Sequence, residues 1–462
     1  MAQASVTGRI VGQAWPVLFG QFSAVAYSVV DTILTGHASP ADLAAMGVAA
    51  GVYGTVFMAL MGVVIALNPI IALHYGAGLH AAIGASVVQG LWVGLLVAVP
   101  GCLLLGFPEL WLSSIAVPPD VGALVARYLR VLSFALPAAL MFRALYALNV
   151  AVSRPKVVMV LQGTGLAVKV VLSAVLIFGA FGLPTLGAVG CAVATLIVHW
   201  LLFALAFAHT RVDGWYGRFR IHFAWPDARM VASQLRLGLP IGLAQALESA
   251  SFALMALVIA RLGTSITGGH QIVVNLAALS YQIPLAIAVA TCTVTAQAIG
   301  AGDVSATRRT AAAGLRLGLA AAAATALTLW VLRAPIVALY TNDPAVAAVA
   351  LSLMGYLVAF HVFDALQGVT AFVLRAHKIV AVPAVIFGVA LWGVGFVGGY
   401  VVAFRPLFGA PRGAAGMWLM QALALFVTSL LLLGFYGLVL RRRLGLGIRG
   451  RGTLGVAELT VR

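Results

Sequence analysis

Long apolar runs separated by short polar breaks dominate the chain, and their lengths predict membrane-spanning helices. A helix needs about 20 apolar residues to cross a bilayer. Twelve runs reach this length, and the pattern therefore predicts an all-α polytopic membrane protein. The first six lie at about residues 14–36, 46–73, 84–107, 122–148, 157–181 and 187–209. The second six lie at about residues 235–262, 270–298, 310–333, 348–374, 379–404 and 414–439.

Two polar stretches divide the chain further. Residues 210–234 are rich in Arg and aromatic side chains, and we expect them to form a cytoplasmic linker between an N-lobe at 1–209 and a C-lobe at 235–440. Residues 441–462 are rich in Arg and Gly, which predicts a basic cytoplasmic tail.

The two halves of the chain share motifs in the same order. Pro16 and Pro240 each open the first span of a half. The Gly-Ala-Gly runs at 76–78 and 300–302 repeat at the same offset as these two prolines. Because each half holds an even number of spans, both halves have the same orientation. The sequence thus predicts a parallel six-plus-six duplication, which is an architecture of transporters.

Charge is scarce and unevenly placed. Of 462 residues, 63% are hydrophobic and 8% charged, against about a quarter charged in soluble domains. The formal net charge of +16 comes from basic residues in alternate breaks, such as Arg154, Lys156, Arg218 and Arg375. This positive-inside pattern predicts a multi-pass protein of the cell inner membrane with both termini cytoplasmic. Anionic lipid at the cytoplasmic face is then the expected surface partner, and nucleic acid is not.

Three acidic residues lie inside the apolar spans: Asp31, Glu248 and Asp364. A charge at the centre of a bilayer costs about 2.5–3.5 kcal/mol on insertion scales, so such residues mark functional sites. The other eight acids lie in polar breaks. They are Asp42, Glu109, Asp120, Asp213, Asp227, Asp303, Asp343 and Glu458.

Each intramembrane acid shares a helical face with polar neighbours three or four residues away. Such polar stripes face a protein interior or a water-filled cavity, because lipid cannot satisfy them. The neighbours are Tyr27 and Ser28 for Asp31, Gln245 and Ser251 for Glu248, and His361 and Gln367 for Asp364.

Lys169 is the one base expected in mid-span, and Asp31 is its expected partner because both lie in the first half. A purely structural Lys–Asp pair and a functional one both fit this pattern. At least two carboxylates then have no fixed countercharge, and each needs a proton or a small cation such as Na⁺. When a cationic solute competes with H⁺ or Na⁺ for such a carboxylate, antiport results. No other cofactor is expected.

Short motifs along both halves carry a family resemblance. They include Val-Asp-Thr at 30–32, Asn-Pro-Ile at 68–70, His-Tyr-Gly-Ala-Gly at 74–78, Ser-Arg-Pro at 153–155, His-Gln-Ile at 270–272 and Gly-Ala-Gly-Asp at 300–303. In this order, the motifs resemble NorM-type members of the multidrug and toxic compound extrusion (MATE) family. The resemblance covers about residues 13–440.

The resemblance implies two six-helix lobes arranged as a V, with alternating access and export of amphipathic, often cationic drugs in exchange for Na⁺ or H⁺. It implies a cation-site acid in each lobe, namely Asp31 in the N-lobe and Glu248 and Asp364 in the C-lobe, where Na⁺ is a candidate ligand. Pro16 matches a proline that acts as a hinge in some relatives. Ser173 stands where many relatives have Asn, which puts Na⁺ binding in the N-lobe in doubt. We expect a monomer.

Two alternatives remain open. A lipid-linked oligosaccharide flippase of the same superfamily would need cavity cations to bind pyrophosphate, and the sequence places only Lys169 at mid-span. An intramembrane enzyme would need a nucleophile–base pair or a metal set at membrane depth. We expect that the protein is not an enzyme, because the whole-chain duplication argues against catalysis.

Overall fold

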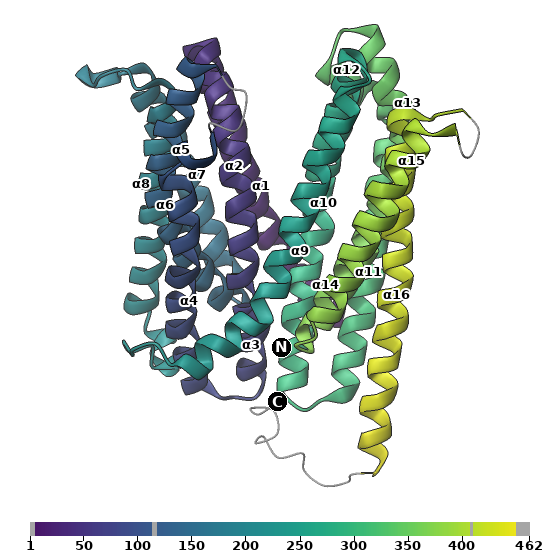
Figure 1. The fold of residues 1–462 in the computed structure, drawn as a ribbon. Helices are drawn as coiled ribbons and strands as arrows, with labels where there is room; N and C mark the ends of the chain where they lie inside the picture. The colour runs from purple at the N-terminus through teal and green to yellow at the C-terminus, as the bar shows by residue number, and fades with distance from the viewer. Residues whose placement is uncertain (1–4, 113–117, 407–409, 450–462) are drawn as a thin grey trace.

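A computed structural model describes residues 5–112, 118–406 and 410–449 of the chain. Within these residues, twelve helices are long and apolar enough to cross a membrane, which confirms the predicted fold class. Figure 1 shows two lobes that meet at one end and diverge at the other, so that the molecule has the shape of a V.

The N-lobe consists of the first six spans and a few short helices. Its elements are α1 (Val6–Ala38), α2 (Pro40–Ile65), α3 (Leu67–Gly76), α4 (His80–Gly106), α5 (Glu109–Leu112), α6 (Pro119–Ala151), α7 (Pro155–Phe178), η1 (Ala180–Gly182) and α8 (Gly187–Val212). The second predicted span is divided into α2 and α3 because Pro69 has no backbone N–H to donate to Ile65, the last residue of α2.

The C-lobe repeats this order of six spans. Its elements are α9 (Ala228–Ala260), α10 (Thr264–Gly300), α11 (Val304–Val331), α12 (Arg333–Tyr340), α13 (Pro344–Ala376), α14 (Ala381–Val389), the π-helical η3 (Ala390–Val397), α15 (Gly398–Phe404) and α16 (Gly413–Arg449). Helix α16 continues through Arg449, so the first residues of the predicted tail are helical; residues 450–462 lie outside the described part.

The segment between the lobes is shorter than predicted. Helix α9 begins at Ala228, because the Asp227 carboxylate accepts hydrogen bonds from the backbone N–H groups of Arg229 and Met230 and caps the helix. The connection contains the 3-10 helix η2 (Gly214–Phe219) and then runs along α4. There the Gln89 amide donates to the Trp225 carbonyl and accepts from the Asp227 N–H.

Six of the eight acids outside the apolar spans have structural contacts at helix ends or in connections. Asp227, Asp303 and Asp343 are N-caps. Asp42 accepts from the Ala188 N–H, and Glu109 pairs with Arg130. Asp213 caps η2, and the Trp215 N–H and the Arg154 guanidinium hold the pKa of its carboxyl below the usual range. These contacts are consistent with a structural role for these six acids.

The lobes meet through a reciprocal pair of glycines. A side chain at Gly76 would lie 2.7 Å from the carbonyl carbon of Gln297, and one at Gly300 would lie 2.9 Å from that of Leu73. Leu73 and Gly76 correspond to Gln297 and Gly300 at the offset that separates Pro16 from Pro240, so each lobe makes the same contact with the other. This reciprocity is what a two-fold axis through the interface produces, and it supports the duplication predicted from the sequence.

Helices α1 and α9 both reach across to the opposite lobe at the closed end. Ile10 and Ala14 of α1 pack on Ile287, Ala290 and Val294 of α10 in the C-lobe. Farther along α1, its contacts are with α7, α2 and α8 of the N-lobe. On α9, Gly238 and Gly242 contact Val63 and Ala59 of α2 in the N-lobe. Small residues thus let the helix backbones approach closely where the lobes join.

The glycine contact gives a test of the lobe interface. We expect Gly76→Ala to lower the free energy of unfolding by about 1–3 kcal/mol, because the added methyl overpacks a backbone contact. Gly12→Ala is the matched control, since a methyl group at Gly12 has open space around it. Thermal unfolding of the purified variants, followed by tryptophan fluorescence, measures the difference. Equal midpoints for the two variants would contradict this description of the interface.

Candidate functional site

The N-lobe contains a cavity of about 300 Å³ between α1, α2, α6, α7 and α8. Aromatic and aliphatic side chains form most of its wall, including Tyr53, Phe57 and Phe142. Four of the residues predicted from the sequence line it: Tyr27, Ser28, Asp31 and Lys169. The Tyr27 hydroxyl donates to the Gln162 carbonyl at 3.4 Å and so links α1 to α7. The polar stripe of the first span therefore lines this cavity, with Asp31 buried and Ser28 exposed.

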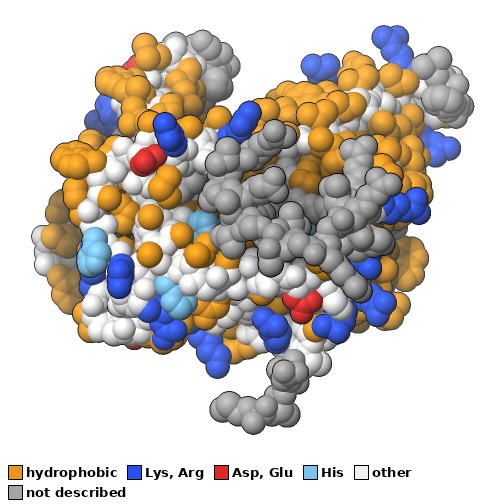
Figure 2. All heavy atoms as spheres, turned by 90° about the horizontal axis from the view of Figure 1, so that it is seen from below, with side chains coloured by type: hydrophobic (Ala, Val, Ile, Leu, Met, Phe, Trp, Pro, Cys, Tyr) orange, Lys and Arg blue, Asp and Glu red, His pale blue; other side chains and the backbone are white. Residues whose placement is uncertain are grey.

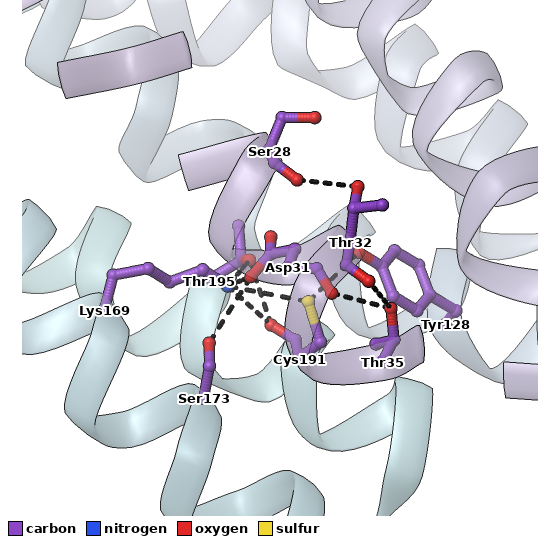
Figure 3. A network of polar contacts seen from close by, with 9 residues as sticks. All are labelled: Ser28, Asp31, Thr32, Thr35, Tyr128, Lys169, Ser173, Cys191 and Thr195. Atoms are coloured by element: carbon purple, nitrogen blue, oxygen red, sulfur yellow. Dashed lines mark hydrogen bonds and ion pairs between the residues drawn. The ribbon is translucent and has the colours of Figure 1, made fainter. Parts of the chain in front are cut away.

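Asp31 forms an ion pair with Lys169, as expected from the sequence. The Lys169 Nζ lies 3.0 Å from Asp31 Oδ1, and the two side chains are 1% and 12% exposed. The Ser173 hydroxyl donates to the same Oδ1 at 3.4 Å. Figure 3 shows that Lys169 and Ser173, which come from α7, approach Asp31 of α1 together with Cys191 and Thr195 of α8. The N-lobe acid thus has a fixed positive partner.

Arg143 is a second base at membrane depth, and the expectation that Lys169 is the sole mid-span base was wrong. Arg143 lies well inside α6 and lines the N-lobe cavity. Its guanidinium lies 5.7 Å from the centre of the Phe57 ring and 5.3 Å from that of Tyr146. Such cation–π contacts stabilise a cation that is held away from water. The sequence did contain the signal, because residue 143 falls within the predicted span 122–148.

The C-lobe acids lie on facing helices without a basic partner. Glu248 on α9 and Asp364 on α13 are close enough for their charges to interact, and both interact with the Tyr281 hydroxyl of α10. The Gln367 amide donates to Asp364 Oδ1 at 3.1 Å. Among the described residues, the ion pairs are Arg130–Glu109, Arg154–Asp213, Lys169–Asp31 and His209–Asp213, and none includes Glu248 or Asp364.

The remaining residues that the sequence placed beside the C-lobe acids have different surroundings. Ser251 accepts a hydrogen bond from the Gln421 amide of α16 at 3.3 Å. Gln245 lies against Gly62 of α2, at the contact between the lobes. His361 is 1% exposed, and its Nε2 has no hydrogen-bond partner within the described residues. Helical spacing predicted a shared face for these residues, but Gln367 is the one that donates a hydrogen bond to its acid.

Tertiary packing adds residues that spacing could not identify. Thr195 and the Cys191 carbonyl bind the Lys169 ammonium from α8. Tyr281 lies beside Asp364, since a side chain at Gly368 would be 3.4 Å from the Tyr281 hydroxyl. Each of these residues is one hydroxyl or carbonyl in an apolar helix, with no Asp, Glu, Lys or Arg within four residues to draw attention to it.

The two lobes therefore differ in chemistry. In the N-lobe, one carboxylate is neutralised by a lysine within the protein. In the C-lobe, two carboxylates interact with each other and neither forms an ion pair among the described residues, although Arg375 of α13 interacts with the same Tyr281 hydroxyl. A pair of membrane-embedded carboxylates in this state is suited to binding a proton, Na⁺ or an organic cation.

Comparison with known proteins identifies the family of the chain. The family model MatE matches residues 16–175 and 240–401, so the two matches begin at the corresponding prolines Pro16 and Pro240. A probable multidrug resistance protein NorM of Aromatoleum aromaticum is 39% identical over 95% of both chains. The multidrug resistance protein PmpM of Pseudomonas aeruginosa is 31% identical over 88% of this chain and 86% of its own length.

Solved structures share the fold. The crystal structure of the eukaryotic MATE transporter AtDTX14 superposes with a TM-score of 0.85 at 20% identity, over 94% of this chain and 95% of that one. A MATE transporter of the MOP superfamily in an outward-facing conformation gives a TM-score of 0.85 at 18% identity, over 95% of this chain and 96% of that one. By family match, identity and fold, the chain belongs to the MatE family of multidrug and toxic compound extrusion transporters and is of the NorM type.

Proposed function

We propose that the protein exports amphipathic organic cations in exchange for H⁺ or Na⁺, by alternating access between the two sides of the cell inner membrane. The observation that carries this proposal is the pair Glu248 and Asp364. These carboxylates interact with each other inside the C-lobe and have no basic partner among the described residues. The names of the relatives, which are multidrug resistance proteins, support drugs as the exported class.

The orientation follows from the basic residues. The connections that contain Arg154, Lys156, Arg218 and Lys378 all lie at the closed end of the V, and Figure 2 shows many Lys and Arg side chains and few acidic ones there. The positive-inside rule places this end, both termini and the linker in the cytoplasm. On this proposal the diverging lobes face outward, as expected of an outward-open state. Anionic lipid is the expected partner of the basic surface.

The proposed cycle uses competition for the C-lobe carboxylates. A drug cation binds while Glu248 and Asp364 are ionised. When H⁺ or Na⁺ enters from outside and neutralises them, the drug loses its counterion and dissociates. The protein can then close on its outer side and open on its cytoplasmic side. Because the carboxylates are neutralised, no unpaired charge moves through hydrocarbon, which lowers the free-energy cost of the transition. A shared carboxylate pair therefore couples the two fluxes.

A lipid-linked oligosaccharide flippase is the second candidate, and Arg143 is the observation that favours it. Arg143 and Lys169 give the N-lobe cavity two cations, one more than the sequence led us to expect. However, Asp31 already neutralises Lys169, and the C-lobe offers acids rather than cations for a pyrophosphate. Relatives that match almost the full length are named for drug resistance, so we favour drug export. Membership in a transporter family likewise favours transport over catalysis.

Removing either C-lobe charge tests the function. We expect Glu248→Gln and Asp364→Asn to reduce ethidium efflux from proteoliposomes to the level of empty vesicles, under either an imposed pH gradient or an imposed Na⁺ gradient. The reason is that a neutral amide neither releases a proton nor attracts a cation. Comparison of the two gradients on the unsubstituted protein identifies the coupling ion.

Glu109→Gln is the matched control, because it removes a carboxylate from an exposed surface pair with Arg130. The control should transport at the unsubstituted rate. If Glu248→Gln and Asp364→Asn both kept gradient-driven ethidium efflux, the proposed role of the acid pair would be refuted.

Pro16 supplies a second test, as a hinge in α1. It is buried where α1 contacts both lobes, since Ala14 packs on α10 of the C-lobe and Val17 packs on α6 of the N-lobe as well as on α10. A proline lacks the N–H of the helical ladder and so makes bending easier at this point. We expect Pro16→Ala to stiffen α1 and to slow efflux by about tenfold, ~1.4 kcal/mol in the barrier, without lowering the unfolding temperature. Initial efflux rates at equal protein content measure this effect, and an unchanged rate would show that α1 does not bend there.

A further inference from the structure

The Lys169 ammonium is surrounded by oxygen atoms, with the Cys191 Sγ as a further contact at 3.7 Å. Its Nζ lies 3.0 Å from Asp31 Oδ1, 2.9 Å from the Cys191 carbonyl oxygen and 2.6 Å from Thr195 Oγ1. An ammonium group has three N–H donors and no acceptor, so these three oxygens use all of its hydrogen-bonding capacity. The group is 1% exposed and has no donor left for water or for a ligand.

The oxygens come from two helices that converge on the ammonium, and their lone pairs are directed at it. Asp31 belongs to α1, and Cys191 and Thr195 belong to α8, while Lys169 reaches them from α7 (Figure 3). The Thr195 hydroxyl donates its own hydrogen to the Cys191 carbonyl at 3.0 Å, so its free lone pairs face Nζ. The Ser173 hydroxyl adds another oxygen beside Asp31.

A carboxylate, a backbone carbonyl and hydroxyl oxygens are the ligands that a small hard cation takes in proteins. We propose that this cluster is a cation site in which the side chain of Lys169 is the resident cation, and that Lys169 thereby excludes Na⁺ from the N-lobe. Two cations cannot share these oxygens, because each needs the same lone pairs and they repel each other. Arg143 adds further positive charge to the same cavity.

The consequence concerns ion selectivity and rests on the proposed exchange function. With the N-lobe carboxylate permanently occupied, the mobile coupling cation binds only at Glu248 and Asp364. Lys169 is then a specificity-determining residue. Its removal should convert the N-lobe cluster into a Na⁺ site made of Asp31, Thr195, Ser173 and the Cys191 carbonyl.

Ion binding tests this directly, without transport. The purified protein is unfolded thermally in NaCl, KCl or choline chloride at constant ionic strength. We expect Lys169→Met to gain a Na⁺-specific rise in Tm of about 1–2 °C at 100 mM, as for a site of roughly 10 mM affinity. Adding Asp31→Asn to Lys169→Met should remove the gain. Lys156→Met is the matched control, because it deletes a lysine that lies over the Trp15 ring, away from the cluster.

The alternatives give distinct results. If Lys169→Met folds and shows no Asp31-dependent Na⁺ response, the pair is only structural and the proposal fails. Should Lys169→Met not fold, Lys169→Gln replaces it, since the shorter amide still donates a hydrogen bond but carries no charge. As a single substitution, with Lys169 kept, Asp31→Asn should leave any Na⁺ response of the protein unchanged. A Na⁺ response that is lost on that substitution would overturn the proposal. Since the readout is binding, these outcomes are independent of whether the protein exports drugs.

Discussion

A carboxylate held inside a bilayer must share its charge with a cation or a proton, and this requirement governs both lobes. Hydrocarbon offers no water to stabilise the ion, so the partner must come from the protein or from a solute. Asp31 has its partner built in, because Lys169 lies 3.0 Å away. Glu248 and Asp364 have each other, Gln367 and Tyr281, but neither forms an ion pair among the described residues. The C-lobe is therefore where a mobile cation would complete the site.

The duplication supplies a symmetric scaffold but not a symmetric chemistry. The lobes meet through the reciprocal contacts of Gly76 and Gly300, and α1 and α9 cross between the lobes in the same way. None of the intramembrane charges repeats, however. At the offset between these two glycines, Asp31, Lys169, Glu248 and Asp364 correspond to Met255, Gly393, Ala24 and Leu140. Two copies of one fold can carry different charges because helix packing depends on shape and small residues, whereas a charge needs only one compensating neighbour.

Contacts at the closed end connect this chemistry to movement. Glycines allow the backbones of α3 and α10, and of α2 and α9, to touch where the lobes join. Backbone contacts of this kind fit closely in one arrangement, so the interface favours discrete states over continuous deformation. Gln245 lies at this joint three residues before Glu248 on α9. A change of charge at Glu248 therefore occurs within one helical turn of the contact between α9 and α2. This contact must change if the protein opens to the other side of the membrane.

The amino-acid sequence alone determined the helical class, the twelve spans, the duplication and the three intramembrane acids. These features are local or periodic: span length follows from the bilayer, and a charge in an apolar run is visible without a structure. Even the Lys169–Asp31 pair could be predicted, because few bases were available. Helix boundaries were less predictable, since the Asp227 cap starts α9 within the expected linker.

Only the tertiary structure decided which polar groups meet. It placed Arg143 in the N-lobe cavity, Thr195 and the Cys191 carbonyl on the lysine, and Tyr281 beside Asp364. It also showed that Gln245 contacts Gly62 and that Ser251 bonds to Gln421, contacts that helical spacing could not predict. The physical reason is that these contacts join helices far apart in sequence. Helical spacing fixes only the direction of a side chain, and the packing of neighbouring helices fixes what that side chain meets.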